Sequence, residues 1–542
     1  MRGWPINWIL ELDPLTALAT VLATSTLYAG LFWALVTIAL TLLAGRFFCG
    51  FACPLGTLNQ FTGWAGRRSL GLAGRVEANR HRRSQALKYY LLVCLLALAL
   101  MGSVQTGVFD PLPLIHRSVN LALAPLADNH LGLLSDEPRL YASVWLLGVV
   151  FLAVVGLNLV LPRFFCRFLC PLGALFGLLS RFSPWRIGKT SDKCGDCRIC
   201  EEYCEGACRP SGTFIGGECV MCLNCLDRCP AGRVAFATTA SAAGEVGLPD
   251  LSRRGLIVAG GGLLLASMCG IGGLAGPNRD ANLIRPPGAL DEDRFLARCL
   301  RCGQCMRICP TNIIQPALLE AGVQGLWSPA INYRISRGGC LPNCIACGQV
   351  FPTAAIRPLS LEEKQGQGEF AAQGPIRMGT AFVDRGRCLP WAMDRPCLVC
   401  QEMCPVSPKA IFVRTVFETI RDGQDLAAKA QGSGVVLDAA IPTAANLASG
   451  DYYLRPAGAP EAALRRITGL AGTSLTLERP LTGLPAEGGR VDIAVHLSRP
   501  FVDAAKCTGC GMCEHDCPVS GRRAIRVYNE NESRSGPGRL LI

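Results

Sequence analysis

The stretch CLRCGQCMRICP at residues 299–310 carries a cysteine spacing, C-x2-C-x2-C-x3-C, that occurs intact four times in this chain. The four copies are Cys194/Cys197/Cys200/Cys204, Cys219/Cys222/Cys225/Cys229, Cys299/Cys302/Cys305/Cys309 and Cys507/Cys510/Cys513/Cys517. In the last three copies a proline follows the fourth cysteine. Bacterial ferredoxins bind 4Fe–4S clusters with this spacing, and their fourth cysteine serves the partner cluster. The motif therefore predicts several iron–sulfur clusters and an electron-transfer function.

Two further cysteine sets have looser spacing. One consists of Cys388, Cys397, Cys400 and Cys404, and the other of Cys340, Cys344 and Cys347, with Phe351 at its fourth position. We expect about six clusters in total. If these two sets pair, crossed ligation assigns Cys404 to the Cys340 set, Cys517 to the Cys299 set and Cys309 to the Cys507 set. The site of Cys388, Cys397 and Cys400 then lacks a fourth ligand, and we predict a 3Fe–4S cluster, a cubane with a non-cysteine ligand, or an empty site.

Other uses of the 30 cysteines fit less well. Zinc sites use paired C-x2-C elements, and disulfide frameworks belong to small secreted domains. Cys94 and Cys269 lie alone in apolar runs, and Cys208 is either an alternative ligand or a spare thiol. No C-x2-C-H haem motif occurs, and no G-x-G-x-x-G follows a predicted strand.

The composition predicts a membrane protein. Mean hydropathy is +0.31, and apolar runs cover residues 16–45, 86–104, 141–162 and 255–276. A helix needs roughly 20 mostly apolar residues to cross a bilayer. We therefore expect a helical membrane domain with about four spans, joined to two α+β ferredoxin-like domains.

Charge predicts the orientation of these spans in a bacterial inner membrane. Seven basic residues between Arg67 and Lys88 face a single Glu77, which marks the loop after the first span as cytoplasmic. The ferredoxin domain 186–240 is then cytoplasmic and the domain 280–542 periplasmic. This topology puts the amino terminus outside, which suggests that an upstream span is missing. The net charge of +12 reflects topology, so we expect no nucleic-acid partner.

An internal repeat occupies the membrane domain, residues 1–185. RFFCGFACPLGTL at 46–58 and RFFCRFLCPLGAL at 163–175 are identical at ten of thirteen positions. Each repeat has a C-x3-C-P pair, Cys49/Cys53 and Cys166/Cys170. These cysteines ligate another cluster, form a redox thiol relay, or pack at a helix break; their spacing is not the ferredoxin one.

Ionisable residues near the predicted outer boundary are candidates for accepting protons from a quinol. Asp110 and His116 lie in the loop between the second and third spans, and Asp13 precedes the first span. Asp-Pro turns and interfacial histidines also occur without any catalytic role. His116 has only its position in its favour.

The carboxyl-terminal half begins at SRRGLI, residues 252–257, before an apolar segment. This segment, 252–278, reads as a twin-arginine-like anchor or as a span with two anchoring arginines. Residues 414–500 alternate apolar and polar side chains and predict a small β-rich insertion within the domain 280–542.

These motifs resemble a fusion of two iron–sulfur subunits of the quinol dehydrogenase that serves periplasmic nitrate reductase. Residues 1–240 resemble the NapH-type membrane subunit of the NapH/NosR family. Residues 252–413 and 500–528 resemble the NapG-type exported four-cluster subunit. The chain departs from the pattern in lacking the first span, at Phe351, in the insertion, and in making the twin-arginine signal an internal linker.

The resemblance implies quinol oxidation and electron delivery to a periplasmic reductase or carrier. Its substrate would be the quinone pool of the surrounding lipid. The alternative function is a transmembrane relay that takes electrons from a cytoplasmic donor and supports maturation or activity of a periplasmic metalloenzyme.

Overall fold

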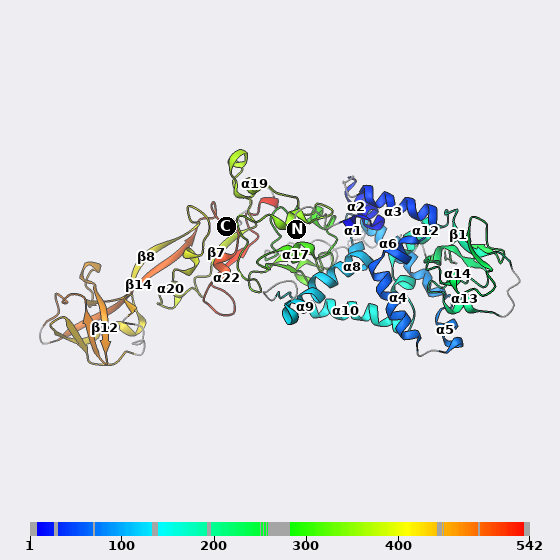
Figure 1. The fold of residues 1–542 in the computed structure, drawn as a ribbon. Helices are drawn as coiled ribbons and strands as arrows, with labels where there is room; N and C mark the ends of the chain where they lie inside the picture. Colours follow the sequence, from blue (N-terminus) through cyan, green and yellow to red (C-terminus); the bar gives the residue numbers. More distant parts are fainter. Residues whose placement is uncertain are drawn as a thin grey trace. The chain divides into compact units, whose positions relative to one another are not determined.

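The computed structural model of the chain describes residues 8–26, 31–68, 71–132, 139–191, 197–249, 251–252, 254–255, 257, 282–441, 447, 449–485 and 488–535 (Figure 1). Two compact units make up the chain. The first contains Met1–Ile335 and Cys344–Phe370, and the second contains Ser336–Asn343 and Ala371–Ile542. Each unit has its own core and is described by itself.

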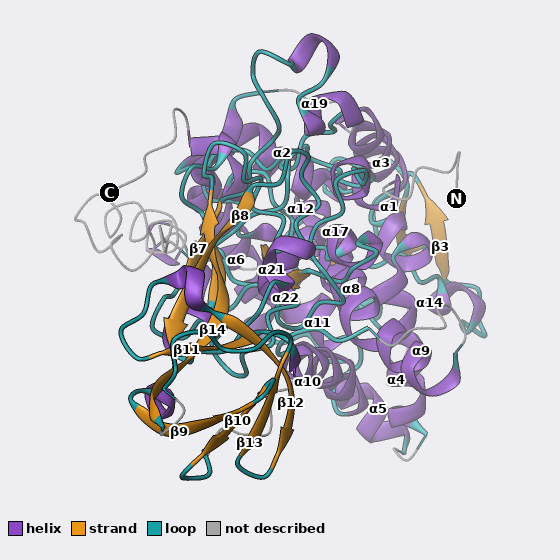
Figure 2. Cartoon of the chain, turned by 90° about the vertical axis from the view of Figure 1, so that its left-hand side faces the viewer, coloured by secondary structure: helices purple, strands orange, loops and turns teal. Residues whose placement is uncertain are grey.

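Helices dominate the amino-terminal part of the first unit (Figure 2). They are α1(Trp8–Glu11), α2(Pro14–Thr24), α3(Leu31–Ala44), η1(Phe48–Ala52), α4(Pro54–Arg67), α5(Leu72–Ala78), η2(Arg83–Ala86), α6(Leu87–Leu100), α7(Thr106–Phe109), α8(Pro111–Ser118), η3(Val119–Leu123), α9(Ala124–Leu131), α10(Val144–Gly156), η4(Leu157–Leu159), α11(Phe164–Phe168) and α12(Pro171–Ser180). Among the described residues, one helical stretch, Leu72–Leu100, is long and apolar enough to cross a membrane. Shorter apolar helices cover Pro14–Thr24, Phe32–Ala44, Val144–Leu159 and Pro171–Ser180.

The prediction of one span over residues 16–45 is wrong. Ser25 adopts a left-handed conformation and ends α2, and the Thr37 hydroxyl of α3 donates to the Leu12 carbonyl at 2.8 Å. The segment is therefore a pair of helices that fold back on each other. Hydropathy measures the length of an apolar run and does not detect a turn inside it. The predicted span at 255–276 lies outside the described residues apart from Gly255 and Ile257.

The sequence repeat corresponds to a repeated arrangement of helices. In each copy an Asp-Pro pair starts a helix, α2 after Asp13 and α8 after Asp110. An apolar helix follows, α3 or α10, and then a C-x3-C turn. The second cysteine of each turn caps the next helix: the sulfur of Cys53 accepts from Gly56 N and that of Cys170 from Gly173 N.

A small α+β domain follows the helices. Strand β1(Arg186–Lys189) pairs with β3(Val234–Ala237), and β2(Phe214–Ile215) pairs with β4(Glu245–Val246). Helices α13(Ile199–Glu202) and α14(Asn224–Asp227) and the turn η5(Gly216–Glu218) lie between the strands.

The remainder of the first unit surrounds the Cys299 motif. Its elements are α16(Glu292–Leu296), α17(Gln304–Ile308), β5(Ile314–Pro316), η7(Leu319–Ala321), β6(Pro329–Ile331), α18(Ala346–Gln349), α19(Leu361–Gln365) and η8(Gly368–Phe370). Strands β5 and β6 form an antiparallel pair directly after the motif.

The second unit contains two motifs and a separate β domain. β7(Thr380–Val383) pairs with β15(Ile525–Tyr528) beside α20(Leu389–Ala392), α21(Val399–Glu402) and α22(Met512–His515). The β domain consists of β8(Ile411–Thr419), β9(Leu426–Gln431), β10(Gly434–Leu437), β11(Tyr452–Pro456), β12(Arg465–Ala471), β13(Ser474–Leu477) and β14(Gly489–Val502), with the short turns η9(Arg421–Gly423) and η11(Glu461–Ala463). The turn η12(Ser533–Ser535) ends the described chain.

The strand order of this domain is β11-β12-β13-β10-β9-β14-β8, and β11 also pairs with β14. This extra pairing closes six strands into a barrel around a core that includes Leu454, Leu475, Val491 and Ile493. The strands lie where the alternating pattern predicts them. β8 extends from the barrel, paired with the last part of β14.

Candidate iron–sulfur site and buried carboxyl pair

A short helix stands before the fourth position of every cysteine motif. These helices pack in three pairs: α13 with α14, α17 with α18, and α21 with α22. Each contact brings two cysteine motifs side by side. In the first two pairs the motifs are neighbours in the sequence, and in the third pair they are the two motifs of the second unit.

Three of the four intact motifs, those of Cys219, Cys299 and Cys507, share an unusual backbone. The residues two and four positions after the first cysteine have left-handed φ angles: Met221 and Leu223, Arg301 and Gly303, and Gly509 and Gly511. The amides of Met221, Arg301 and Gly509 donate to the sulfurs of Cys219, Cys299 and Cys507. Alternating left-handed residues turn successive N–H groups toward one concave side, which suits a negatively charged iron–sulfur core. Three of these six residues, Met221, Leu223 and Arg301, have side chains, so their conformations are held against a steric cost.

Cys204 lies with the Cys219 set. Burial raises the pKa of the Cys222 thiol to about 12, and the nearby Glu205, Cys204 and Cys219 add to the rise. Cys204 and Cys219 likewise contribute to the raised pKa of Cys225 after burial. The fourth cysteine of the first motif therefore joins the second motif, as crossed ligation predicts. Cys194 lies outside the described residues.

Cys197 differs in exposure from the other described cysteines of its motif. It is exposed, whereas Cys200 and Cys204 are buried. Cys197 precedes α13, and Cys200 and Cys204 belong to the core of the α+β domain. Ligation of a cluster by Cys197 stays a prediction.

Cys208 is also part of the buried group. Its sulfur lies 3.3 Å from that of Cys204 and interacts with Cys219. Cys208 therefore lies beside Cys204 and Cys219. This position fits both interpretations of Cys208, an alternative ligand and a spare thiol.

The motifs of the second unit cross in the same manner. Burial raises the pKa of Cys400 to about 12, with Cys388, Cys397 and Cys517 contributing. Burial raises the pKa of Cys510 to about 12, with Cys507, Cys340 and Cys404 contributing. Cys517 thus closes the Cys388 set, and Cys404 closes the Cys507 set.

The predicted pairing of the four carboxyl-terminal motifs is therefore wrong. The assignments of Cys404 to the Cys340 set, of Cys517 to the Cys299 set and of Cys309 to the Cys507 set are all replaced. Cys517 stands at the fourth position of the Cys388 set. Sequence spacing predicts that motifs exchange their fourth ligands, but the choice of partner depends on which helices pack together.

The Cys299 set instead faces the motif of Cys344 and Cys347. Burial raises the pKa of the Cys305 thiol strongly, and Cys302, Cys299 and Cys347 add to the rise. Cys309 precedes β5 in the same unit, with its sulfur 3.7 Å from the Thr311 hydroxyl. Cys340 belongs to the second unit, where its backbone N–H donates to the Cys510 carbonyl at 2.7 Å.

Crowded, buried thiols are poor thiolates by themselves, because each neighbouring charge disfavours the next. A bound iron–sulfur core supplies the positive iron ions that compensate several thiolates at once. Among the described residues, no three Cys, His, Asp or Glu side chains are close enough to hold one metal ion. The motif spacing and the amides that donate to the sulfurs of Cys219, Cys299 and Cys507 fit an iron–sulfur cluster.

The four cysteines of the C-x3-C-P repeats also come together. Cys53 interacts electrostatically with Cys166 and Cys49, and Cys170 with the same two residues. The amide of Asn59 donates to the sulfur of Cys166 at 3.4 Å, and Arg46 reaches the sulfur of Cys49 at 3.9 Å. A guanidinium and an amide directed at sulfur resemble the hydrogen bonds that tune protein iron–sulfur clusters.

The four-cysteine site, meaning Cys49, Cys53, Cys166 and Cys170, adjoins the α+β domain. A Cβ atom on Gly50 would lie 2.7 Å from the Val220 carbonyl oxygen, between Cys219 and Cys222. Arg46 donates to the Gly217 carbonyl at 2.9 Å. The C-x3-C turn of the first repeat is therefore packed directly against the loop of the Cys219 set.

Buried ion pairs hold this contact. Arg163 Nε lies 2.7 Å from Glu205 Oε2, and Lys88 pairs with Glu218. Tyr89 also donates to Glu218, at 3.1 Å. All five side chains are buried, so these charges are compensated by specific partners rather than by solvent.

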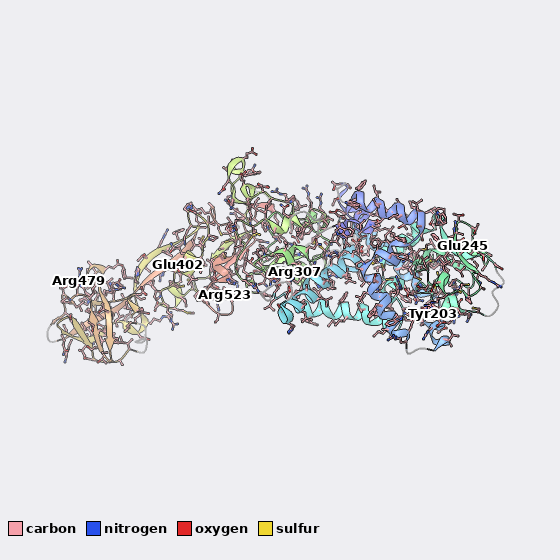
Figure 3. The ribbon with its side chains drawn as sticks, viewed as in Figure 1. Tyr203, Glu245, Arg307, Glu402, Arg479 and Arg523 are labelled. Atoms are coloured by element: carbon pink, nitrogen blue, oxygen red, sulfur yellow. The ribbon has the colours of Figure 1, made fainter. Side chains whose placement is uncertain are left out.

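The Cys299 motif packs against a different set of helices. Arg301 donates to the Val104 carbonyl at 2.8 Å, and Asn120 donates to the Cys302 carbonyl at 3.4 Å. Arg307, labelled in Figure 3, reaches Asp128 of α9 at 2.6 Å. Cys302 shares one apolar core with Cys53 and Cys170, so the helices lie between the cysteine groups.

Asp110 and Asp13 form a carboxyl pair in this core. Both side chains are fully buried, at 0% and 1% exposure, and the two carboxyl groups interact with each other. Asp110 Oδ1 accepts from Leu112 N, and Asp13 accepts from Leu15 N, Thr16 N and the Thr16 hydroxyl. Two carboxyl groups in such contact hold a proton between them, because both cannot carry charge. His116 is not part of the pair: it lies near the other end of α8, and burial lowers its pKa.

A cavity of about 640 Å³ lies near the Cys299 motif. Its walls include Thr24, Ser103, Leu296, Ala297 and Arg298. Thr24, Thr20 and Thr16 follow each other at intervals of four on α2, so they share one face of the helix. The buried Thr20 hydroxyl oxygen has no hydrogen-bond partner in the described structure. The Thr24 hydroxyl donates to the Thr20 backbone carbonyl at 2.7 Å, so the three hydroxyl groups share a face without forming a continuous hydrogen-bonded chain.

Sequence reasoning found Asp110 and did not find its pairing with Asp13. The available signal was the shared Asp-Pro-Leu at 13–15 and 110–112. This tripeptide repeats together with the C-x3-C-P element, and duplicated segments that pack symmetrically bring equivalent residues together. Asn59 gave no signal, since nothing in its local sequence marks a sulfur contact.

Comparisons with known proteins agree with these cysteine sites. A family described as "4Fe-4S binding domain" matches residues 26–73 and 143–190, the two C-x3-C-P repeats. Another family with this description matches residues 295–315. No solved structure matches the chain.

Similar proteins include ferredoxin-type and electron-transport proteins. Protein NirI of Paracoccus denitrificans is 27% identical over 41% of this chain and 32% of NirI. The putative electron transport protein YccM of Escherichia coli is 28% identical over 42% of the chain and 61% of YccM. The ferredoxin-type protein NapG of Escherichia coli is 34% identical over 24% of the chain and 50% of NapG. The chain thus matches about a third of NirI and under two thirds of YccM.

The chain is an iron–sulfur electron-transfer protein related to NirI, YccM and NapG. These similarities are consistent with a fusion of NapH/NosR-type and NapG-type ferredoxin modules.

Proposed function

We propose that the protein is a membrane quinol dehydrogenase that passes electrons from the quinone pool to a periplasmic reductase or carrier. The observation that carries this proposal is the cavity beside the Cys299 motif, one wall of which is α2, the helix that Asp13 of the Asp13–Asp110 pair caps. Oxidation of a quinol to a quinone releases two electrons and two protons. In this proposal cysteine-ligated clusters take the two electrons, the carboxyl pair takes one proton, and the second proton leaves to solvent.

The cavity is suited to a quinol headgroup. Its volume falls in the range of small-molecule sites. Ser103 and Thr24 supply hydroxyl groups and Arg298 a guanidinium, which match the two oxygens of a quinol. Arg298 also immediately precedes Cys299, so an electron leaving the cavity has a short route to a cysteine-ligated centre.

The carboxyl pair serves as proton acceptor in this proposal. With one shared proton the pair carries one negative charge, and it can accept one further proton. Thr16, whose hydroxyl donates to Asp13, lies on the same face of α2 as Thr24 at the cavity wall, so this face is the proposed side of proton passage. His116 remains a second candidate acceptor on position alone.

Iron–sulfur clusters, when bound, carry electrons one at a time, and the chain sets their spacing and environment. In the proposed topology the helices lie in the inner membrane, residues 186–240 face the cytoplasm and residues 280–542 face the periplasm. The proposed partners are the quinone pool, a periplasmic acceptor and a cytoplasmic electron donor.

One observation favours the alternative, a relay from a cytoplasmic donor. The Cys219 loop contacts the turn between Cys49 and Cys53 directly, held by Glu205 and Glu218. Such close packing suits electron passage between the α+β domain and the four-cysteine site. A periplasmic quinol site would not by itself require that domain.

The two functions are separated by blocking the cavity. Ala23→Trp, at the cavity wall on α2, should reduce quinol-dependent cluster reduction at least tenfold in membrane vesicles. Leu18→Trp, on the exposed side of the same helix, is the control and should retain the native rate. Dithionite reduction of both variants should stay complete, which shows that the clusters are intact. The quinol proposal would be overturned if neither menaquinol nor ubiquinol reduced any cluster of the native protein.

A further inference from the structure

We infer that the iron–sulfur site of Cys299, Cys302 and Cys305 has three cysteine ligands and holds a 3Fe–4S cluster, because Phe351 occupies the position of the fourth ligand. This inference concerns cluster type and does not depend on quinol oxidation.

The backbone around Phe351 retains the conformation of a closing ligand. The residue three positions after the fourth site is left-handed in four motifs: Ala207 after Cys204 (φ 55°), Gly232 after Cys229 (φ 59°), Asn312 after Cys309 (φ 55°) and Ala354 after Phe351 (φ 53°). Alanine and asparagine adopt this conformation at a cost, so the turn is held by its surroundings. Phe351-Pro352-Thr353 also repeats Cys309-Pro310-Thr311 with phenylalanine in place of cysteine.

Helix pairing decides which cluster loses its ligand. α17 of the Cys299 motif packs on α18, which ends at Gln349, two residues before Phe351. Cys305 interacts with Cys347, both being third cysteines. The same contact between third cysteines occurs for Cys225 and Cys200 and for Cys513 and Cys400. In those two pairs the fourth position of one motif closes the other motif, so residue 351 is the closing position of the Cys299 set.

Neighbouring oxygen atoms have other partners. The Thr353 hydroxyl donates to the Arg298 carbonyl. Glu292 forms a two-point ion pair with Arg285, at 2.5 and 3.2 Å. Cys299, Cys302 and Cys305 are 1–4% exposed, so solvent does not readily supply a ligand. In a four-iron cubane cluster, the iron that has no protein ligand is the one that the cluster loses. The remaining cluster contains three irons and four sulfides.

The altered centre is packed against α7, α8 and η3, through Gly107, Asn120 and Leu121. It is therefore a carboxyl-terminal centre in direct contact with the helices. Its potential is expected to differ from those of the four-cysteine clusters, since cluster type sets potential.

The test is electron paramagnetic resonance and Mössbauer spectroscopy of the full-length protein, purified without oxygen and then mildly oxidised. The native protein should show the signal of an oxidised three-iron cluster at about one spin per chain. Phe351→Cys should abolish that signal and add one iron per chain. Val350→Cys, buried but one residue out of register, should leave the signal in place.

A second variant checks the ligand assignment at another site. Cys517→Phe imitates the natural Phe351 at the Cys388 set and should produce a second three-iron signal. A native protein without the signal, a signal that appears only after exposure to air, or a signal that survives in Phe351→Cys would each overturn the inference. Failure of quinol to reduce any cluster would leave these spectra unchanged, so the two proposals fail separately.

Discussion

The carboxyl groups of Asp13 and Asp110 come together within the helical core, although they start different copies of a sequence repeat. Each aspartate also caps a helix that begins with proline. Asp110 additionally acts electrostatically on Cys170, which places the pair within range of the four-cysteine site. The relationship ties protonation of the pair to the charge of that site.

Asp110→Asn should lower quinol oxidation by about 100-fold, the lower end of the range for removing a proton acceptor. Asparagine caps a helix as well as aspartate does, so the fold should persist. The rate of cluster reduction by quinol and the far-ultraviolet circular dichroism check both statements. His116→Asn is the comparison: an equal loss there, with Asp110→Asn active, would assign the role to His116 instead.

Cys53→Ser and Cys166→Ser should each remove one cluster from the protein, which lowers the iron content by about four atoms per chain for a 4Fe–4S cluster. Cys94→Ser is the matched control, since Cys94 is a half-buried thiol on α6 outside all the cysteine sets. Iron and acid-labile sulfide analysis give the answer. Unchanged iron in both ligand variants would leave a thiol relay or helix packing as the role of these residues.

Asn59→Ala should lower the midpoint potential of the four-cysteine site. The amide stabilises negative charge on the Cys166 sulfur, and the reduced state has more of that charge. A hydrogen bond worth about 1 kcal/mol corresponds to roughly 40 mV for a one-electron couple. Redox titration followed by paramagnetic resonance measures the shift. Thr62→Val, which removes only bonds to the Leu58 and Asn59 carbonyls, should not move the potential.

Lys88→Met should destabilise the contact between the α+β domain and the helices by about 3–5 kcal/mol, because it leaves Glu218 charged and buried. Thermal unfolding in detergent, with limited proteolysis of residues 186–249, should report the loss. Lys88→Met combined with Glu218→Leu should recover much of it. Arg80→Met breaks an exposed pair with Glu77 and should change stability by less than about 1 kcal/mol.

The cysteine motifs were readable from sequence because ligand spacing is local. C-x2-C-x2-C fixes three sulfurs within one turn, and the left-handed residues at Arg301 and Gly303 belong to that same turn. The exchange of fourth ligands was also predictable. Which motif exchanges with which was not, since it depends on α17 packing on α18 and α21 on α22 across segments of different length. Spacing also could not predict that Cys197 is exposed, because exposure depends on what packs over the residue.

The helices also combine features that the sequence predicts with features that it does not. The repeat at Cys49/Cys53 and Cys166/Cys170 was visible in sequence, and the structure gathers all four residues. Ser25, which turns α2 back, carries no strong turn signal among apolar neighbours, so the apolar run at 16–45 predicts one span. The pairing of Asp13 with Asp110 depends on that fold-back and could not be read from either residue alone.

The barrel is connected to the rest of the second unit through two adjacent strands. Ile411, where β8 begins, pairs with Val502, where β14 ends. Neighbouring strands lie about 4.8 Å apart, so the barrel leaves and returns at nearly one point. The distance between Cys404 and Cys507 therefore does not depend on the residues that lie between those two strands in the sequence. A gene could acquire, exchange or discard this segment as a cassette while both cluster ligands keep their places.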